Sequence, residues 1–181
     1  MKLIKSTIGV LIACCILIGA IWGAYELFPL KYLNDIRTVS ASNGVDKYLV
    51  AALIKAESNF KCDAVSSAGA KGVMQLTDDT ARFCAEKIGM NFESEDIYNP
   101  KVNIQLGVYY LSRTLSIFNG DESLAVAAYN AGEGRVRKWL EDPEYSTDGT
   151  TLDTIPYHET KRHVEKIKAY KKIYKLLYPN L

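Results

Sequence analysis

The stretch KYLVAALIKAESNF, residues 47–60, decides the fold class of this chain. Six consecutive positions, residues 49–54, are apolar and leave no polar stripe. A helix that is apolar all round is buried in the core of a domain. Asp46 directly precedes the stretch and is a good N-cap for such a helix. The sequence therefore predicts a central buried helix that starts after Asp46.

Glu57 follows Leu53 by one turn, at the C-terminal end of this predicted helix. A carboxylate near a helix C-terminus opposes the helix dipole, and burial also disfavours the charged form of a carboxyl group. Both effects favour the protonated acid, which is the form that a general acid needs near neutral pH. Glutamates are mostly exposed, so Glu57 taken alone is better explained as a solvated residue at a helix end.

The remaining residues after position 29 read as further helices joined by loops. Caps and apolar spacing predict helices at residues 30–43, 78–88, 100–118, 123–130, 135–140 and 155–178. No segment shows a convincing strand-like alternation of apolar and polar residues. The predicted fold class is therefore all-α, or nearly so.

Composition excludes few classes of function. The formal net charge is +1, which offers no argument for nucleic-acid binding. There are 12 Tyr against 5 Phe and 2 Trp, and tyrosine rings suit both a sugar-lined groove and a partly buried helix surface. Acidic residues gather at 141–153 and basic residues at 161–175. We interpret them as a solvated loop and a solvated helix face, with a partner surface on the loop as the alternative.

The N-terminus predicts a membrane anchor at residues 1–28, followed by a domain at residues 29–181. Lys2 and Lys5 precede residues 6–25, which carry no charge and are long enough to cross a bilayer as a helix. The two lysines predict that the N-terminus stays in the cytoplasm and that the domain lies on the extracytoplasmic side. A cleaved signal peptide would have a shorter apolar region and small residues at its cleavage site. A lipoprotein-like box at residues 11–14 falls in the middle of the apolar run.

Cysteine and histidine usage predicts no metal site. Cys14 and Cys15 lie in the predicted anchor, and Cys62 and Cys84 lie in the predicted exported domain. An oxidising compartment allows a disulfide between the second pair, but spacing alone does not decide it. The two histidines, His158 and His163, make no zinc-site spacing with the cysteines.

Four short motifs occur in a fixed order along the chain. They are ESNF at residues 57–60, SSAGAKGVMQ at 66–75, AAYNAG at 127–132 and IPYHET at 155–160. This ordered set resembles the catalytic domain of the soluble lytic transglycosylase family, which is similar to goose-type lysozymes. The resemblance covers residues 30–178 and implies a lysozyme-like fold. It departs from the family at Thr77 and Asp78, where another Met and then a Pro are common.

The resemblance implies a role for each matching position. Glu57 matches the single catalytic acid/base, and the glycine-rich turn at residues 69–72 would let the backbone approach the polysaccharide closely. His163 stands where a tyrosine is usual, and either contacts substrate or sits on the helix face. The other positions that match substrate-contacting residues are Ser66, Gln75, Tyr129, Asn130 and Glu159.

The activity that the resemblance implies is cleavage of peptidoglycan at the β-1,4 bond between N-acetylmuramic acid and N-acetylglucosamine. The product has a 1,6-anhydromuramic end, and no metal or cofactor is needed. One glutamate acts as acid and then as base, unlike the two-carboxylate scheme of most glycosidases. We read the nearest other carboxylates as caps and loop charges: Asp63, Asp78, Asp79 and Glu133.

Three alternatives remain open from the sequence. The first is a lysozyme-like hydrolase, which a carboxylate opposite Glu57 would favour. The second is a non-catalytic peptidoglycan-binding module, which has no need of the acid. The third is a structural protein with a partner in an envelope machine.

Overall fold

The structure, a computed structural model, describes the backbone of residues 2–181 and the side chains of residues 13–181. Its elements are α1 (Lys2–Leu27), α2 (Leu33–Asn43), α3 (Lys47–Ser58), α4 (Asp78–Lys87), the short 3-10 helix η1 (Ser94–Tyr98), α5 (Pro100–Ile117), α6 (Glu122–Ala131), α7 (Glu133–Glu141) and α8 (His158–Leu177). Within residues 2–181 the extended pairing is confined to isolated bridges of Lys71 with Val65 and Leu76. The predicted all-α class is therefore confirmed.

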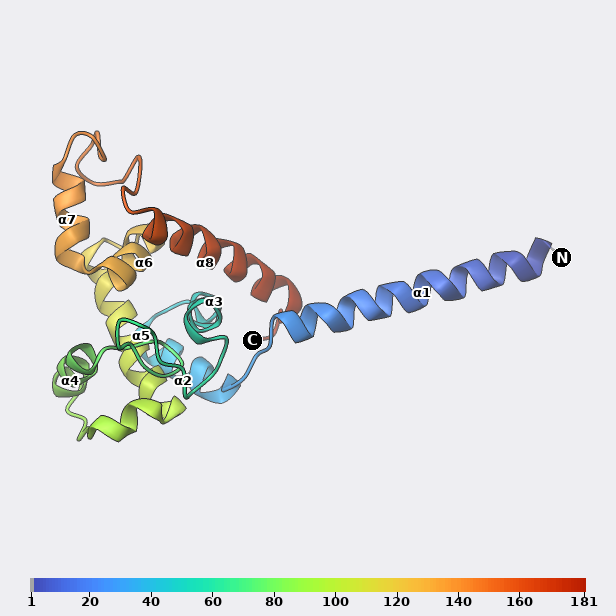
Figure 1. Ribbon diagram of the computed structural model, residues 1–181, viewed down its shortest axis with the longest axis horizontal. Coiled ribbons are helices and arrows are strands. Elements are labelled where there is room, and N and C mark those ends of the chain that lie inside the picture. The colour runs from blue at the N-terminus through green and yellow to red at the C-terminus, as the bar shows by residue number, and fades with distance from the viewer. Residues whose placement is uncertain (1) are drawn as a thin grey trace.

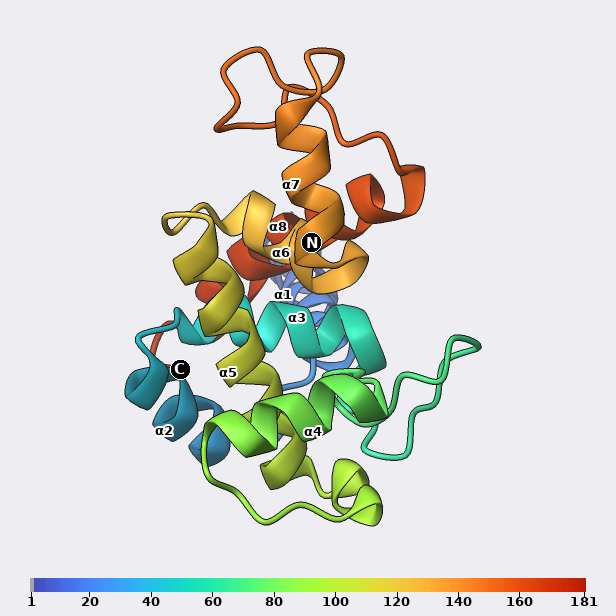
Figure 2. The same cartoon turned by 90° about the vertical axis from the view of Figure 1, so that its left-hand side faces the viewer.

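Helix α3 is the centre of the fold. Residues 49–54 are buried on every side, as the uninterrupted apolar run predicts. The Asp46 side chain accepts a hydrogen bond from the Tyr48 backbone N–H at 2.8 Å, so the predicted N-cap is also confirmed. Figure 2 shows α3 in the middle, with α4 on one side and α6, α7 and α8 on the other.

Two apolar clusters build the core on the two sides of the domain. The larger cluster surrounds α3 and includes residues of α2, α5, α6 and α8. The smaller cluster joins α4 and η1 to α5 through Ala81, Cys84, Ile97 and Leu106. Helix α5 contributes to both clusters, and it therefore fixes the distance between the two sides of the domain.

Most helices start and end within two residues of the predicted bounds. The helix predicted from residue 30 starts at Leu33 instead, because Tyr32 before it has a left-handed backbone conformation. Two further differences concern α8 and η1. The last helix starts at His158 rather than at residue 155, because Pro156 disfavours helical geometry at Ile155. Helix η1 was not predicted; its five residues are held by a capping box between Glu93 and Asp96. Both differences concern short segments that local chemistry decides.

Helix α1 projects away from the globular part of the molecule (Figure 1). The predicted span is residues 6–25, and the side chains of its first part, residues 6–12, lie outside those that the structure describes. Across the described part of the chain, no helix combines the length and the apolar composition that a membrane crossing requires.

The C-terminal end of α1 is attached to α8 through tyrosines. The Tyr25 hydroxyl donates to the Leu177 carbonyl at 3.0 Å, and the Tyr178 hydroxyl donates to the Phe28 carbonyl at 2.8 Å. The Tyr174 hydroxyl donates to the carbonyl of residue 29 at 2.8 Å. These contacts explain part of the tyrosine excess as helix packing rather than as sugar binding.

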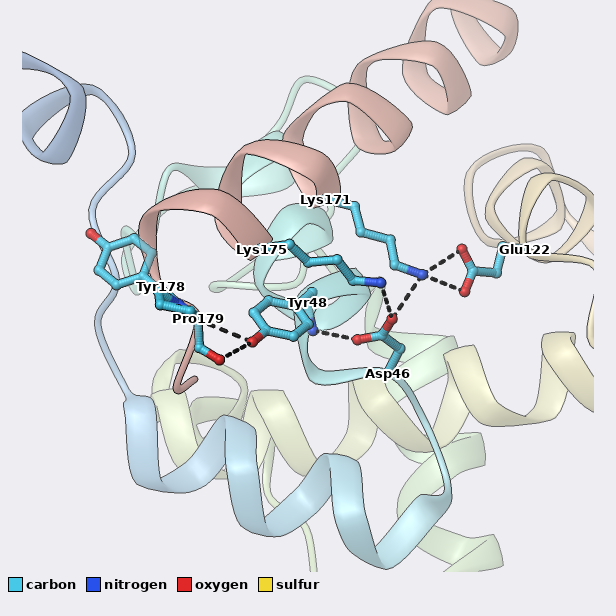
Figure 3. Close-up of polar contacts among 7 residues, drawn as sticks. All are labelled: Asp46, Tyr48, Glu122, Lys171, Lys175, Tyr178 and Pro179. Carbon is cyan, nitrogen blue, oxygen red and sulfur yellow. Dashed lines mark hydrogen bonds and ion pairs between the residues drawn. The ribbon is translucent and has the colours of Figure 1, made fainter.

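An ion-pair network locks α8 against α3 and α6 (Figure 3). Lys171 Nζ lies 2.8 Å from Asp46 Oδ2 and 2.6 Å from Glu122 Oε1, and Lys175 Nζ lies 3.5 Å from the same Asp46 oxygen. Burial acts to raise the pKa of Asp46, but the bonds from Lys171 and the Tyr48 N–H outweigh it and hold that pKa below its usual value. The network therefore fixes the position of α8 along the axis of α3.

Cys62 and Cys84 are both free thiols. Cys84 is buried in the smaller apolar cluster, whereas Cys62 packs against the larger one. Burial raises the pKa of the Cys84 thiol to about 12. The disulfide that the sequence left open is therefore not formed in this structure.

The acidic segment between α7 and α8 is held by its own carboxylates. Asp148 accepts backbone N–H bonds from Thr150 and Thr151 at 2.6 and 2.7 Å. Asp153 accepts a backbone N–H bond from Thr147 at 2.8 Å. Aspartates that bond the backbone a few residues away are typical of turns, which supports the interpretation of this segment as a solvated loop.

Candidate active site

A cavity of about 460 Å³ brings together six of the seven predicted site residues: Glu57, Ser66, Gln75, Tyr129, Asn130 and Glu159. They come from the end of α3, the loop after it, the end of α6 and the start of α8. A cavity of this size is within the usual range of ligand sites.

Glu57 lies in the last turn of α3, as predicted. The helix ends there because Asn59 and Phe60 both adopt left-handed backbone angles, with φ of 54° and 63°. The Ser58 hydroxyl, buried in the core, donates to the Val73 carbonyl at 2.7 Å. The serine of the Glu-Ser pair thus ties the end of α3 to the glycine-rich loop, and Glu57 remains on the cavity side.

Gln75 and Ser66 shape the loop as well as the cavity. Gln75 has a φ of 49°, and its Nε2 donates to the carbonyls of Ala64 and Gly72 at 3.1 and 2.9 Å. The amide nitrogen of Gln75 therefore uses its hydrogens within the loop, and Oε1 is left as the acceptor for a ligand. Ser66 Oγ accepts from the Ala70 N–H at 3.0 Å and keeps its hydroxyl hydrogen to donate.

Position 72 requires glycine because neighbouring protein atoms leave no room for a side chain, and not because a ligand approaches there. A Cβ there would lie 2.3 Å from Asn103 Nδ2 and 2.5 Å from the Ile97 carbonyl oxygen. The expectation that Gly72 opens the backbone to a polysaccharide is therefore replaced by a packing reason. Gly69, by contrast, has a φ of 81° and open space where a Cβ would be.

Asn103 is a residue that sequence reasoning missed. It is 0% exposed, accepts from the Met74 N–H at 2.7 Å, and donates to the carbonyls of Lys71 and Ile97 at 3.1 and 2.9 Å. The bonds with Met74 and Lys71 hold the loop that carries Gln75 against α5, and the bond with Ile97 holds η1 there as well. The signal in the sequence was an amide between Val102 and Ile104 in a predicted apolar helix.

Tyr129 presents its ring to the cavity while its hydroxyl is used internally. The hydroxyl donates to the Met74 carbonyl at 2.8 Å. Burial, followed by the nearby Glu57 carboxyl, raises the pKa of Tyr129 well above its usual value. The phenol therefore stays neutral and keeps its hydrogen bond over the whole physiological pH range.

Asn130 is oriented by Thr160, a second residue that was missed. The Thr160 hydroxyl is buried and donates to Asn130 Oδ1 at 2.7 Å. With its oxygen occupied, Asn130 has its amide hydrogens left for a ligand. Thr160 follows Glu159 in the first turn of α8, so one turn both lines the cavity and sets the amide.

Glu159 is the second carboxylate that lines the cavity. The other four candidates lie elsewhere: Asp78 pairs with Lys71 at 2.7 Å, Glu133 pairs with Arg113, Asp79 lies in the first turn of α4, and Asp63 is exposed. The hydrogen bond from Arg113 is the main cause that lowers the pKa of Glu133. Their interpretation as caps and loop charges is supported.

His163 faces Glu57 and does not line the cavity. Its Nε2 lies 3.2 Å from Glu57 Oε1. This distance suits an ion pair, but the two groups are not aligned for a hydrogen bond. Over the described residues, no three His, Cys, Asp or Glu side chains are grouped to hold a metal ion.

Comparisons with known proteins agree with this geometry. The family described as the transglycosylase SLT domain matches residues 35–150. The soluble lytic murein transglycosylase of Salmonella typhimurium is 31% identical over 162 residues, which cover 87% of this chain and 25% of that protein.

Two solved structures share the fold. An inactive glutamate-to-glutamine mutant of the lytic transglycosylase Slt from Pseudomonas aeruginosa is 37% identical, with a TM-score of 0.75 over 82% of this chain and 24% of that one. The 70 kDa soluble lytic transglycosylase from Escherichia coli is 28% identical, with a TM-score of 0.76 over 84% and 25% of the two chains.

The chain thus spans about a quarter of the length of these relatives. The predicted lysozyme-like, all-helical fold is confirmed by the structural likeness. Because the family match covers most of the globular part and contains Glu57, Gln75 and the Tyr129–Asn130 pair, this chain belongs to the transglycosylase SLT domain family.

Proposed function

We propose that this chain is a peptidoglycan lytic transglycosylase. It cleaves the β-1,4 bond between N-acetylmuramic acid and N-acetylglucosamine and leaves a 1,6-anhydromuramic end. The observation that carries the proposal is Glu57, which is 15% exposed and lies at the end of a buried helix in a cavity lined by Ser66, Gln75, Tyr129 and Asn130. The relatives are lytic transglycosylases by name, which supports the reaction, and the Pseudomonas relative is described as inactive after a glutamate-to-glutamine change.

The proposed chemistry uses Glu57 twice. The protonated carboxyl donates to the leaving glycosidic oxygen, and the resulting carboxylate then takes the proton of the sugar's own C6 hydroxyl, which closes on C1. The net proton change on the enzyme is zero. Gln75 Oε1 and the Asn130 amide hydrogens are the polar groups that orient the sugar, because their other atoms are bound to the protein.

A second candidate is a lysozyme-like hydrolase. Glu159 shares the cavity with Glu57, and two carboxylates across a cleft are the usual arrangement for hydrolysis by water. In that case a water molecule replaces the C6 hydroxyl as the nucleophile. The two reactions differ in their products, which makes them separable by one measurement.

Digestion of purified peptidoglycan with the full chain is expected to release anhydromuropeptides, identified by mass spectrometry. Their mass is lower than that of the reducing-end products by one water, because the C6 hydroxyl takes the place of the external nucleophile. Reducing-end products would identify the hydrolase. Binding to peptidoglycan without any release would contradict both reactions and favour a wall-binding module.

We propose further that residues 1–28 form a single-pass membrane anchor that holds residues 29–181 on the extracytoplasmic side. The proposal is supported by the uncharged run at residues 6–25 and by the exposed apolar side chains of Ile16, Leu17 and Ile18 on α1. The tyrosine contacts of α1 with α8 would then keep the cavity close to the membrane surface.

The full chain is expected to stay in the membrane pellet after carbonate extraction, and protease added to spheroplasts is expected to degrade its domain. The double variant Ile16→Lys and Ile18→Lys is expected to appear in the supernatant, since each charge at the centre of a span costs about 3 kcal/mol. Gly19→Ala, which keeps the run apolar, is the matched control. Release of the unchanged chain by carbonate would contradict the anchor.

A further inference from the structure

His163 lies beside Glu57, and the proposed reaction does not use it. Its Nε2 lies 3.2 Å from Glu57 Oε1, and the two side chains are 12% and 15% exposed. The same nitrogen is buried and has no hydrogen-bond partner. A buried polar atom without a hydrogen-bond partner costs folding free energy. A hydrogen bond from this imidazole to the neighbouring Glu57 carboxyl would remove that cost.

The position of His163 is set by contacts on both sides of it along α8. One turn earlier, Thr160 donates to Asn130 on α6 at 2.7 Å. One turn later, Lys166 Nζ donates to the Ala56 carbonyl on α3 at 3.4 Å. Because α8 is tied to α6 and α3 at these two points, the imidazole has no route away from Glu57 other than rotation of its own side chain.

We propose that His163 is a positioning residue for Glu57. During the reaction its Nε2–H donates to Glu57 Oε1, and Oε2 becomes the oxygen that gives and then regains the proton. Catalytic hydrogen bonds are often poorly aligned in the absence of substrate and tighten when it binds. The inference rests on the proposed function, and it adds a residue that fixes which carboxyl oxygen reacts.

The contact also ties the activity to the charge of the imidazole. The charged and titratable groups near Glu57 are Tyr129 on α6, which acts electrostatically on its carboxyl, Glu159 on α8, which lines the same cavity, and Lys166 on α8, which binds the carbonyl of the preceding residue. Tyr129 stays neutral, because burial and the nearby Glu57 carboxyl raise the pKa of its phenol well above the usual value. Histidine is the side-chain type whose charge ordinarily changes near neutral pH, so the test of this contact includes a pH profile.

The sign of the effect follows from electrostatics. An imidazolium 3.2 Å from Oε1 stabilises the Glu57 carboxylate. A protonated imidazole in this position would make the carboxylate a weaker base toward the C6 hydroxyl in the second proton transfer, so we expect a lower kcat on the acid side of the pH profile.

The test compares two variants at position 163, made in the full chain, whose side chains have similar lengths. His163→Gln keeps an N–H donor near the position of Nε2 but does not titrate, whereas His163→Met removes the donor. His158→Gln is the matched control, because it removes the exposed histidine in the first turn of α8. The kcat and KM for release of anhydro products from soluble glycan fragments are measured between about pH 4 and 9, which brackets the titration of histidine.

His163→Met is expected to lower kcat at the optimum by roughly tenfold to a hundredfold, with little change in KM, because a misplaced catalytic group loses rate rather than binding. His163→Gln is expected to retain most of kcat and to lose the decline on the acid side. His158→Gln is expected to keep the wild-type profile.

Three results would overturn the inference while leaving the proposed function intact. They are an unchanged kcat in His163→Met, an unchanged acid-side decline in His163→Gln, and a rise in KM alone, which would assign His163 to substrate binding. Thermal melting of each variant shows whether a lost rate reflects lost folding. An inactive wild type would instead contradict the proposed function itself.

Discussion

Glu57→Gln is expected to lower the rate of glycan cleavage by about a thousandfold, the typical size of a general acid–base contribution. Glutamine fills the same space at the end of α3 and lines the same cavity, but it has no proton to donate and no charge with which to take one back. The rate is measured as the release of soluble fragments from peptidoglycan, counted by chromatography.

Glu159→Gln is the matched variant, because it makes the same change at the other carboxylate of the cavity. If one glutamate serves as both acid and base, Glu159 contributes hydrogen bonds to the sugar, and its loss is expected to cost about tenfold or less. A loss in Glu159→Gln as large as that in Glu57→Gln would contradict the single-carboxylate scheme and support the hydrolase. Equal melting temperatures for the two variants confirm that the fold is kept.

Gly72→Ala is expected to destabilise the domain by about 3 kcal/mol, which combines the cost of a left-handed backbone with that of overpacking. The φ of Gly72 is 77°, and an added Cβ would lie 2.3 Å from Asn103 Nδ2 and 2.5 Å from the Ile97 carbonyl oxygen. Since Ile97 contributes backbone and Asn103 is held by three hydrogen bonds, neither neighbour moves easily. The free energy of unfolding is measured by urea denaturation.

Gly69→Ala separates the two causes. Its φ is 81°, close to that of Gly72, but no atom lies within 4 Å of the added Cβ. We expect a cost of about 1 kcal/mol from the backbone alone. Equal costs for the two variants would show that Asn103 and Ile97 do not restrict position 72. Gly72→Ala is also expected to lose activity, because the loop that it displaces carries Gln75.

Patterns that act within a few residues were readable from the chain. The apolar run at residues 49–54 determined the buried helix, and Asp46, Thr77, Asn99 and Asp121 determined where four helices begin, because each side chain caps the backbone directly after it. The order of the four motifs determined the family. Glu57 lies at the end of this helix as predicted, since its position on the helix follows from the bounds of the helix.

The structural roles of individual residues depend on contacts between distant parts of the chain, which only the tertiary structure shows. Gly72 faces Asn103, Thr160 holds Asn130, and His163 faces Glu57, and these partners are separated by 31, 30 and 106 positions. Local spacing carries no information on which helix packs against which. The register of α8 on α3 depends on burial and on the Lys171 network, and it is this packing alone that places an imidazole against the carboxyl at the centre of the site.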